Sequence, residues 1–114
     1  MQIQLNTSHV QNDDRLQEWL EEEVGRRLDR FGDHVTRVEA YIADVNANKG
    51  GMDKRCTLEV RHAGRNPIAV HHDAGNVADA VHGAVGKLVT ALDSSLGRAR
   101  DAHARETIRG QSGD

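Results

Sequence analysis

YIADVNANKGGMDKRCTLEV, residues 41–60, is the stretch of sequence that decides the fold. Apolar and polar residues alternate on both sides of a loop that carries Gly50-Gly51, and this period of two predicts a pair of strands joined by the loop. With the first strand extended back to Val35, one face of the pair is predicted to carry Val38, Ala40, Ile42, Cys56, Leu58 and Val60, and the other face Arg37, Glu39, Tyr41, Thr57, Glu59 and Arg61. Such a pair has one side for a core and one side for water or a partner.

The flanking segments complete the order strand, helix, three strands, helix. Gln2–Asn6 alternates like a half-buried strand, and an amphipathic helix follows that ends at Gly32. After a hairpin loop at residues 63–67, Ile68 and Val70 mark a last short strand. A second helix is expected from just after Asp73 to about Arg105. Its glycines at 83 and 86 either allow close packing on the sheet or weaken the helix.

Two helices with one apolar stripe each, over a sheet with one apolar face, predict a two-layer α+β sandwich with a four-stranded sheet. The 114 residues fit one domain, which we expect to span residues 1–106. Residues 107–114 are polar and are predicted to form a disordered tail.

Composition excludes several classes of function. The net charge of -3 gives no overall attraction to nucleic acid, so RNA binding would need a local basic patch. Trp19, Phe31 and Tyr41 are too few for a protein that stacks single-stranded bases. The single cysteine fits a reducing compartment, and neither a secretory signal nor an apolar run long enough for a membrane is evident, so a soluble cytoplasmic protein is expected.

Catalytic and metal-binding patterns are weak. Cys56 lies among apolar neighbours and is interpreted as an inert buried thiol, and no phosphate-binding loop occurs. The sequence therefore predicts neither an enzyme nor a cofactor or small-molecule substrate. A metal-responsive regulator is the least favoured alternative: it would place His62 and His71 across the last hairpin from each other, with His72 or Asp73 nearby, although exposed strand histidines explain these residues better.

Basic residues are the strongest candidates for a function. Arg26, Arg27 and Arg30 cluster at the end of the first helix, and Lys87 lies on the second. Cations are common near helix C-termini because of the helix dipole, and Glu22–Arg26 has the spacing of an ordinary i, i+4 pair. If both helices present these residues on one outer edge, they form a positive groove that suits an RNA backbone.

The chain resembles the ribosome hibernation-promoting factor / ribosome-associated inhibitor A family, once called sigma-modulation proteins, over about residues 1–105. The resemblance is carried by MQIQL, RRLDRFGDHVTRVEA, DVNANKGGMDKRCTLEV and AVHGAVGKL. GGMDKRC is similar to a divergent branch of that family, and without a long C-terminal extension the chain resembles its short form. The resemblance implies a βαβββα fold with both helices on one sheet face and binding to rRNA of the small ribosomal subunit. Arg27 and Arg30, with Arg26, match basic positions of the family's first helix, and Lys87 matches a lysine of its second.

We therefore expect a non-enzymatic hibernation or translation-inhibition factor. The residues predicted to contact rRNA are Arg26, Arg27, Arg30, Lys54, Arg55 and Lys87. The alternative is a protein-binding or self-associating module that has kept the fold and lost rRNA binding. It would use the exposed sheet face around Tyr41 or an edge strand.

Overall fold

The structure, a computed structural model, describes the backbone of residues 1–45, 53–62 and 66–111, and the side chains of these ranges up to residue 96. The elements follow the predicted order, with a short 3-10 segment, η1, between the first helix and the second strand. Their bounds are β1 Gln2–Ser8, α1 Asp14–Leu28, η1 Asp29–His34, β2 Val35–Asp44, β3 Lys54–His62, β4 Ile68–Ala74 and α2 Val77–Gln111. The α+β class and the βαβββα order predicted from the sequence are confirmed.

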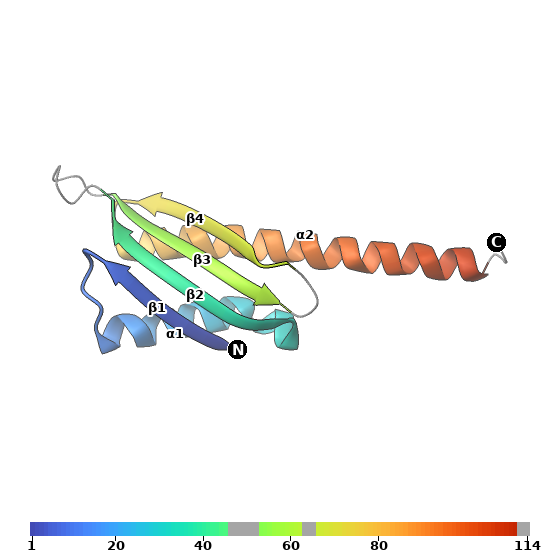
Figure 1. Cartoon of the computed structure of the whole chain (residues 1–114), viewed down its shortest axis with the longest axis horizontal. Helices are drawn as coiled ribbons and strands as arrows, with labels where there is room; N and C mark the ends of the chain where they lie inside the picture. Colours follow the sequence, from blue (N-terminus) through green and yellow to red (C-terminus); the bar gives the residue numbers. More distant parts are fainter. Residues whose placement is uncertain (46–52, 63–65, 112–114) are drawn as a thin grey trace.

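The four strands form one sheet in the order β1-β2-β3-β4 (Figure 1). β1 runs parallel to β2, and the other two pairings are antiparallel. A parallel pair needs a crossover connection, which α1 supplies. Both helices lie behind the same face of the sheet in Figure 1, so neither α1 nor α2 covers the other face.

The core fills the space between the sheet and the two helices. All six residues predicted to face inward from β2 and β3 are buried, at no more than 1% exposure: Val38, Ala40, Ile42, Cys56, Leu58 and Val60. The helices contribute buried leucines and valines, among them Leu20 and Val24 from α1 and Leu88 and Leu92 from α2. The alternation that predicted the strands therefore also separates the core from the outer face.

Side-chain caps mark the starts of both helices, and a glycine with positive φ follows the end of α1. Asp13 accepts a hydrogen bond from the Leu16 amide and caps α1. Gly32 adopts a positive φ of 54° within η1, where a side chain would be strained, and the chain then enters β2. α2 begins at Val77, later than expected, because β4 continues to Ala74 and the Asn76 side chain caps the helix by accepting from the Asp79 amide at 2.8 Å.

The far end of α2 also differs from the sequence-based expectation. The helix runs to Gln111 and extends past the end of the sheet (Figure 1), whereas it was expected to stop near Arg105. Residues 107–111, part of the predicted tail, are included in α2. The division into a domain of residues 1–106 and a tail stays a prediction.

The two central glycines of α2 have different surroundings, which decides between the two roles that the sequence left open. A Cβ at Gly83 would overlap the imidazole ring of His72 on β4, whereas a Cβ at Gly86 would have no neighbour within 4 Å. Gly83 therefore allows α2 to approach β4 closely. Gly86 only lowers the helix propensity.

Gly86→Ala is expected to raise the free energy of unfolding by up to about 1 kcal/mol, because alanine favours the helix and meets no obstacle. Gly83→Ala is the matched substitution and is expected to lower stability, since the new methyl group must displace His72. Urea denaturation of the two variants measures both changes. Equal stabilisation by both alanines would show that His72 does not limit the approach of α2.

Candidate nucleic-acid interface

Three of the predicted RNA-binding arginines lie together at the end of α1. Arg26 and Arg27 occupy the last turn of α1, and Arg30 follows in η1. Carbonyl groups at a helix C-terminus favour cations, so this position suits the arginines before any partner binds.

A buried carboxylate holds two of these arginines. Glu23 is only 9% exposed. Its oxygens lie 2.8 Å from Nη2 of Arg26 and 3.8 Å from Nη1 of Arg27. His82 of α2 is a third neighbour, with its Nε2 3.6 Å from Glu23 Oε1. A charge this deep needs partners, and Glu23 finds them on both helices. The expected Glu22–Arg26 pair is thus replaced by Glu23–Arg26, because Glu23 faces α2.

The third arginine joins the helices directly. Nη2 of Arg30 lies 2.5 Å from Oδ2 of Asp93 on α2. The guanidinium also sits over the ring of Phe31, with its central carbon 4.6 Å from the ring centroid. Stacking on an aromatic face and pairing with a carboxylate both suit a guanidinium and fix its position.

We call this group the interhelical cluster; its members are Glu23, Arg26, Arg27, Arg30, His82 and Asp93. Three arginines face two carboxylates, so the cluster carries a positive charge in a chain whose net charge is -3. Its arginine side chains remain accessible, with exposed fractions of 67% for Arg26 and 56% for Arg30. Glu22 lines the same surface hollow as Arg26 and adds a carboxylate at the border of the cluster. The cluster is the candidate for the local basic patch that RNA binding by this acidic chain would require.

Trp19 of α1 also lies at the interhelical cluster. The rings of Trp19 and His82 are 5.7 Å apart between centroids, tilted by 43°. A surface hollow of about 310 Å³ is lined by Trp19, Glu22, Glu23 and Arg26. The i, i+4 and i+7 spacing of Trp19, Glu23 and Arg26 could have shown that they share a face of α1, but nothing in the sequence indicates that His82 meets them.

Lys87 lies elsewhere on α2. Its Nζ donates to the backbone carbonyl of His71 on β4 at 2.9 Å. At 100° per residue, Lys87 points about 140° around the helix from His82, the α2 residue beside Glu23. Because β4 is an edge strand, this hydrogen bond also occupies a backbone acceptor at the edge of the sheet. The structure does not bring Lys87 into the interhelical cluster.

Lys54 and Arg55 lie at the other end of the sheet. β2 begins beside η1 and ends at Asp44, opposite Lys54, so roughly 30 Å of strand separates them from Arg30. Lys54 Nζ lies 3.0 Å from Asp44 Oδ2. Arg55 points to the opposite side of β3, where Nε and Nη2 donate to the two carboxylate oxygens of Asp73 at 2.7 and 3.1 Å. This bidentate pair lowers the pKa of Asp73 and raises that of Arg55.

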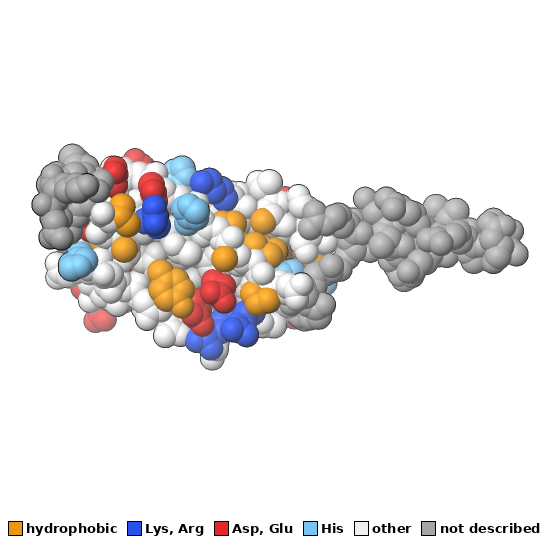
Figure 2. All heavy atoms as spheres, turned by 45° about the horizontal axis from the view of Figure 1, so that its top comes forward, with side chains coloured by type: hydrophobic (Ala, Val, Ile, Leu, Met, Phe, Trp, Pro, Cys, Tyr) orange, Lys and Arg blue, Asp and Glu red, His pale blue; other side chains and the backbone are white. Residues whose placement is uncertain are grey.

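The uncovered outer face of the sheet carries charges of both signs. Tyr41 is 40% exposed, and its hydroxyl donates to Glu39, a hydrogen bond that raises the pKa of Tyr41. Arg37 lies 3.0 Å from the same carboxylate. In the view of Figure 2, acidic side chains lie beside basic ones, and hydrophobic side chains separate these charged groups from one another. Basic side chains gather at the lower edge of this view with acidic ones beside them. Arg37 is opposite Arg61 in the register of β2 and β3, and Arg37 pairs with Glu39.

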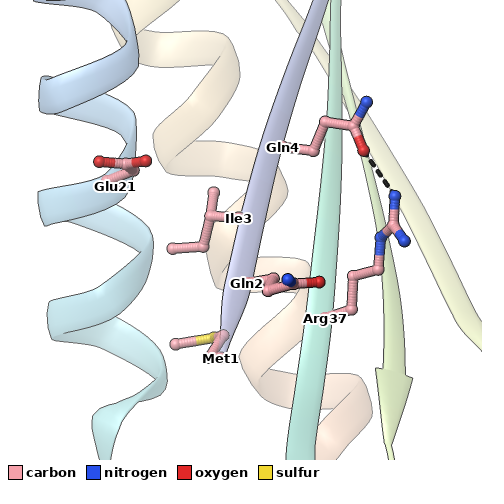
Figure 3. A pocket seen from close by; sticks show the side chains of 6 residues that line it. All are labelled: Met1, Gln2, Ile3, Gln4, Glu21 and Arg37. Atoms are coloured by element: carbon pink, nitrogen blue, oxygen red, sulfur yellow. Dashed lines mark hydrogen bonds between the residues drawn. The ribbon is translucent and has the colours of Figure 1, made fainter.

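Side chains of the edge strand β1 point alternately to the two faces of the sheet. In Figure 3, Met1 and Ile3 point towards α1, whereas Gln4 lies on the other side and accepts a hydrogen bond from Arg37 at 2.5 Å. Together with Gln2 and Glu21, these residues line an open hollow beside the strand. Glu21 comes from α1 on one side of β1, whereas Gln4 and Arg37 lie on the other side, so these polar groups do not converge on one point.

The register contradicts the metal alternative. His62 is opposite Val35 and only 5% exposed, whereas His71 is opposite Thr57 and exposed. These histidines therefore do not face each other, and His62 is not an exposed strand histidine. Its Nε2 lies 3.0 Å from the Asn66 carbonyl oxygen. Within the described parts of the chain, no group of three or more potential ligands could hold a metal ion. No helix in the described parts of the chain has the length and hydropathy needed to cross a bilayer.

Cys56 is buried as predicted, and burial raises the pKa of its thiol to about 12. A pKa that is higher in the folded than in the unfolded state means that folding favours the neutral thiol. The buried neutral thiol therefore contributes its full stability below the ordinary pKa of 9.0, and this stability is lost as the pH rises towards 12. Between pH 9 and 11 we expect the wild type to lose about 2 kcal/mol more stability than Cys56→Ala. Guanidinium denaturation of both proteins at each pH measures this difference. Parallel pH profiles would show that ionisation of Cys56 is not coupled to unfolding.

Comparisons with known proteins agree with the fold. The family model described as sigma 54 modulation protein / S30EA ribosomal protein matches residues 3–103. A ribosomal subunit interface protein from Coxiella burnetii superposes with a TM-score of 0.71 at 20% identity, covering 85% of this chain and 99% of that structure. The N-terminal domain of Protein Y from Thermus thermophilus superposes with a TM-score of 0.68 at 21% identity, covering 82% and 98%. The search of curated proteins found no match.

Proposed function

The chain belongs to the sigma 54 modulation protein / S30EA ribosomal protein family, and from this premise we propose that it is a non-enzymatic hibernation factor that binds rRNA of the small ribosomal subunit and inhibits translation. Its place of action is the cytoplasm, where translating ribosomes are found. Binding uses the phosphate backbone and needs neither a cofactor nor a small-molecule substrate.

The observation that carries this proposal is the interhelical cluster. Arg26 and Arg27 pair with Glu23 where α1 faces α2, and Arg30 pairs with Asp93 further along α2; their side chains are 67%, 35% and 56% exposed. A guanidinium binds phosphate through a planar fork of donors, and arginine is the residue that best combines such a fork with a permanent charge. Each phosphate neutralised in this way releases counterions, which supplies a favourable term that falls with added salt.

Burial of the Glu23 carboxylate strengthens this interpretation. The salt bridges to Glu23 restrict Arg26 and Arg27 before any partner arrives. A side chain that is already ordered loses less conformational entropy on binding. The cluster therefore combines exposure with preorganisation, which solvated surface arginines lack.

The other three predicted cations have secondary roles in this proposal. Lys87 acts on the β4 flank of α2, and Lys54 and Arg55 act at the far end of the sheet. In the described contacts, these three residues pair with groups outside the interhelical cluster. We propose that they contact rRNA only where the small subunit extends beyond the cluster.

The test of function is a cell-free translation assay with ribosomes of the source organism. The protein is titrated against a fixed ribosome concentration while synthesis of a reporter is followed. We expect inhibition to saturate near one protein per ribosome. Full translation with several proteins per ribosome would contradict a role in inhibition.

The alternative function uses the outer sheet face, where Tyr41 is exposed and which neither α1 nor α2 covers. A protein partner would bind there without neutralising the arginines of the cluster. Pairing of ribosome-free protein with a second copy or another protein, together with no effect on translation, would favour this module over the hibernation factor.

A further inference from the structure

Every arginine of the interhelical cluster already binds a carboxylate of its own chain. Arg26 and Arg27 pair with Glu23, and Arg30 pairs with Asp93. Carboxylate and phosphate oxygens accept from a guanidinium with the same planar geometry. An RNA phosphate that reaches these arginines must therefore share them with an internal carboxylate or displace it.

The two carboxylates differ in how easily they can be displaced. The Glu23 side chain is 11% exposed and has neighbours on both helices, so releasing it would leave a buried charge without partners. The Asp93 side chain is 47% exposed, and that of Arg30 is 56% exposed. A freed Asp93 carboxylate can be hydrated at once, and an exposed pair of this kind contributes little stability. Asp93 is the carboxylate that a phosphate can replace.

Arg30 stays positioned after such a replacement. Its guanidinium lies over the Phe31 ring, and Phe31 is itself only 5% exposed and packed in the core. The Phe31 ring supports one face of the Arg30 guanidinium, and Nη2 at the edge of the guanidinium donates to Asp93. Losing Asp93 therefore removes a competing acceptor without removing the support for the arginine.

We propose that Asp93 is a built-in competitor for the RNA phosphate that Arg30 binds, and that it limits the affinity of the interhelical cluster for RNA. This inference rests on the proposed function. Binding in the wild type then requires exchange of one anion for another at Arg30, with the freed carboxylate left close to the RNA backbone. The same arginine with a neutral neighbour makes the contact without that exchange.

Asp93→Asn is expected to tighten binding to small ribosomal subunits by up to about fivefold at low salt, the factor that corresponds to an exposed ion pair. The matched control is Glu18→Gln. Glu18 is an exposed acid on α1, and among the described side chains no ion pair or hydrogen bond involves its carboxylate. Both substitutions remove one negative charge, so the control measures the effect of net charge alone.

A double-mutant cycle separates the role of Arg30 from general repulsion. In the Arg30→Gln background, Asp93 has no arginine to occupy, so Asp93→Asn should improve binding by less than it does in the wild type. Dissociation constants for all five proteins come from quantitative pelleting with labelled protein and isolated small subunits. Circular dichroism melting checks that each variant is folded.

Each outcome has a separate meaning. Tighter binding by Asp93→Asn than by Glu18→Gln, with a smaller gain in the Arg30→Gln background, is the result expected. Binding by Asp93→Asn alone, where the wild type fails to bind, would also support competition. Wild-type binding that Asp93→Asn leaves unchanged overturns the role of Asp93 and leaves the proposed function intact. If no protein of the set binds at low salt, the proposed function fails and the inference fails with it.

Discussion

Replacing both Arg26 and Arg30 by glutamate is expected to weaken binding to the small ribosomal subunit by at least about tenfold at low salt. Two phosphate contacts are lost, and two negative charges then face the RNA backbone. The two arginines are the most exposed of the interhelical cluster, with side-chain exposures of 67% and 56%. The slope of log K against log salt should also decrease by about two units, one for each lost contact.

The control for this variant carries the same change in charge at other places. Arg15 and Arg61 are exposed, on the first turn of α1 and the outer face of β3. Arg15→Glu/Arg61→Glu should therefore bind nearly as tightly as the wild type. Similar losses in both double variants would show that net charge, and not the interhelical cluster, controls binding.

The second large effect concerns the core beneath α2. Leu88 has 0% exposure, and truncating it to alanine is expected to cost about 3 kcal/mol of unfolding free energy, from lost burial and the cavity left behind. Urea denaturation followed by circular dichroism measures this loss. Leu16→Ala is the matched truncation at a partly buried position on α1 and should cost less than half as much.

This comparison also tests how α2 is placed. α2 carries His82 and Asp93 to α1, and Leu88 lies between them in the sequence and packs in the core. Equal losses for the two truncations would mean that α2 does not seal the sheet as the structure shows. In that case the geometry of the interhelical cluster would lose its support.

The fold could be predicted from the sequence because local patterns decide most of it. Alternation at 37–45 and 55–62 gave the correct faces for both central strands, since side chains of a strand point to opposite sides in turn. It fails at the start of β2, where the register shifts between Val35 and Arg37 and Val35 is buried like Val38. The start of α2 was less predictable, because the strand and the helix follow closely. β4 continues to Ala74, and Asn76 already caps the helix that begins at Val77. The role of Gly83 depends on His72, which lies on another element, so no local pattern could reveal it.

The candidate site was only partly predictable, for a physical reason. Spacing along α1 places Arg26, Arg27 and Arg30 near each other, because they follow within about one helical turn. The partner of Arg30 is 63 residues away in the sequence, and its position depends on how α2 crosses the sheet. Spacing alone also suggested Glu22 as the partner of Arg26, although Glu23 faces the second helix.

Lys87 illustrates the same limit. From the sequence, Lys87 would share a positive groove with the arginines if both helices presented their basic residues on one outer edge. In the structure, Lys87 turns towards β4 and hydrogen-bonds the His71 carbonyl, on a different flank of α2 from His82. The face that a helical residue presents to other elements follows from tertiary packing, which a single amphipathic pattern does not specify.

The central claim is that the protein binds the small ribosomal subunit through phosphate contacts. It is tested most directly by co-sedimentation of the purified protein with isolated small and large subunits from about 50 to about 300 mM salt, a range over which phosphate-driven binding falls steeply. The account predicts stoichiometric binding to the small subunit at the lowest salt, progressive loss as salt rises, and little binding to the large subunit. No binding to the small subunit at the lowest salt, or binding that salt does not weaken, would contradict it.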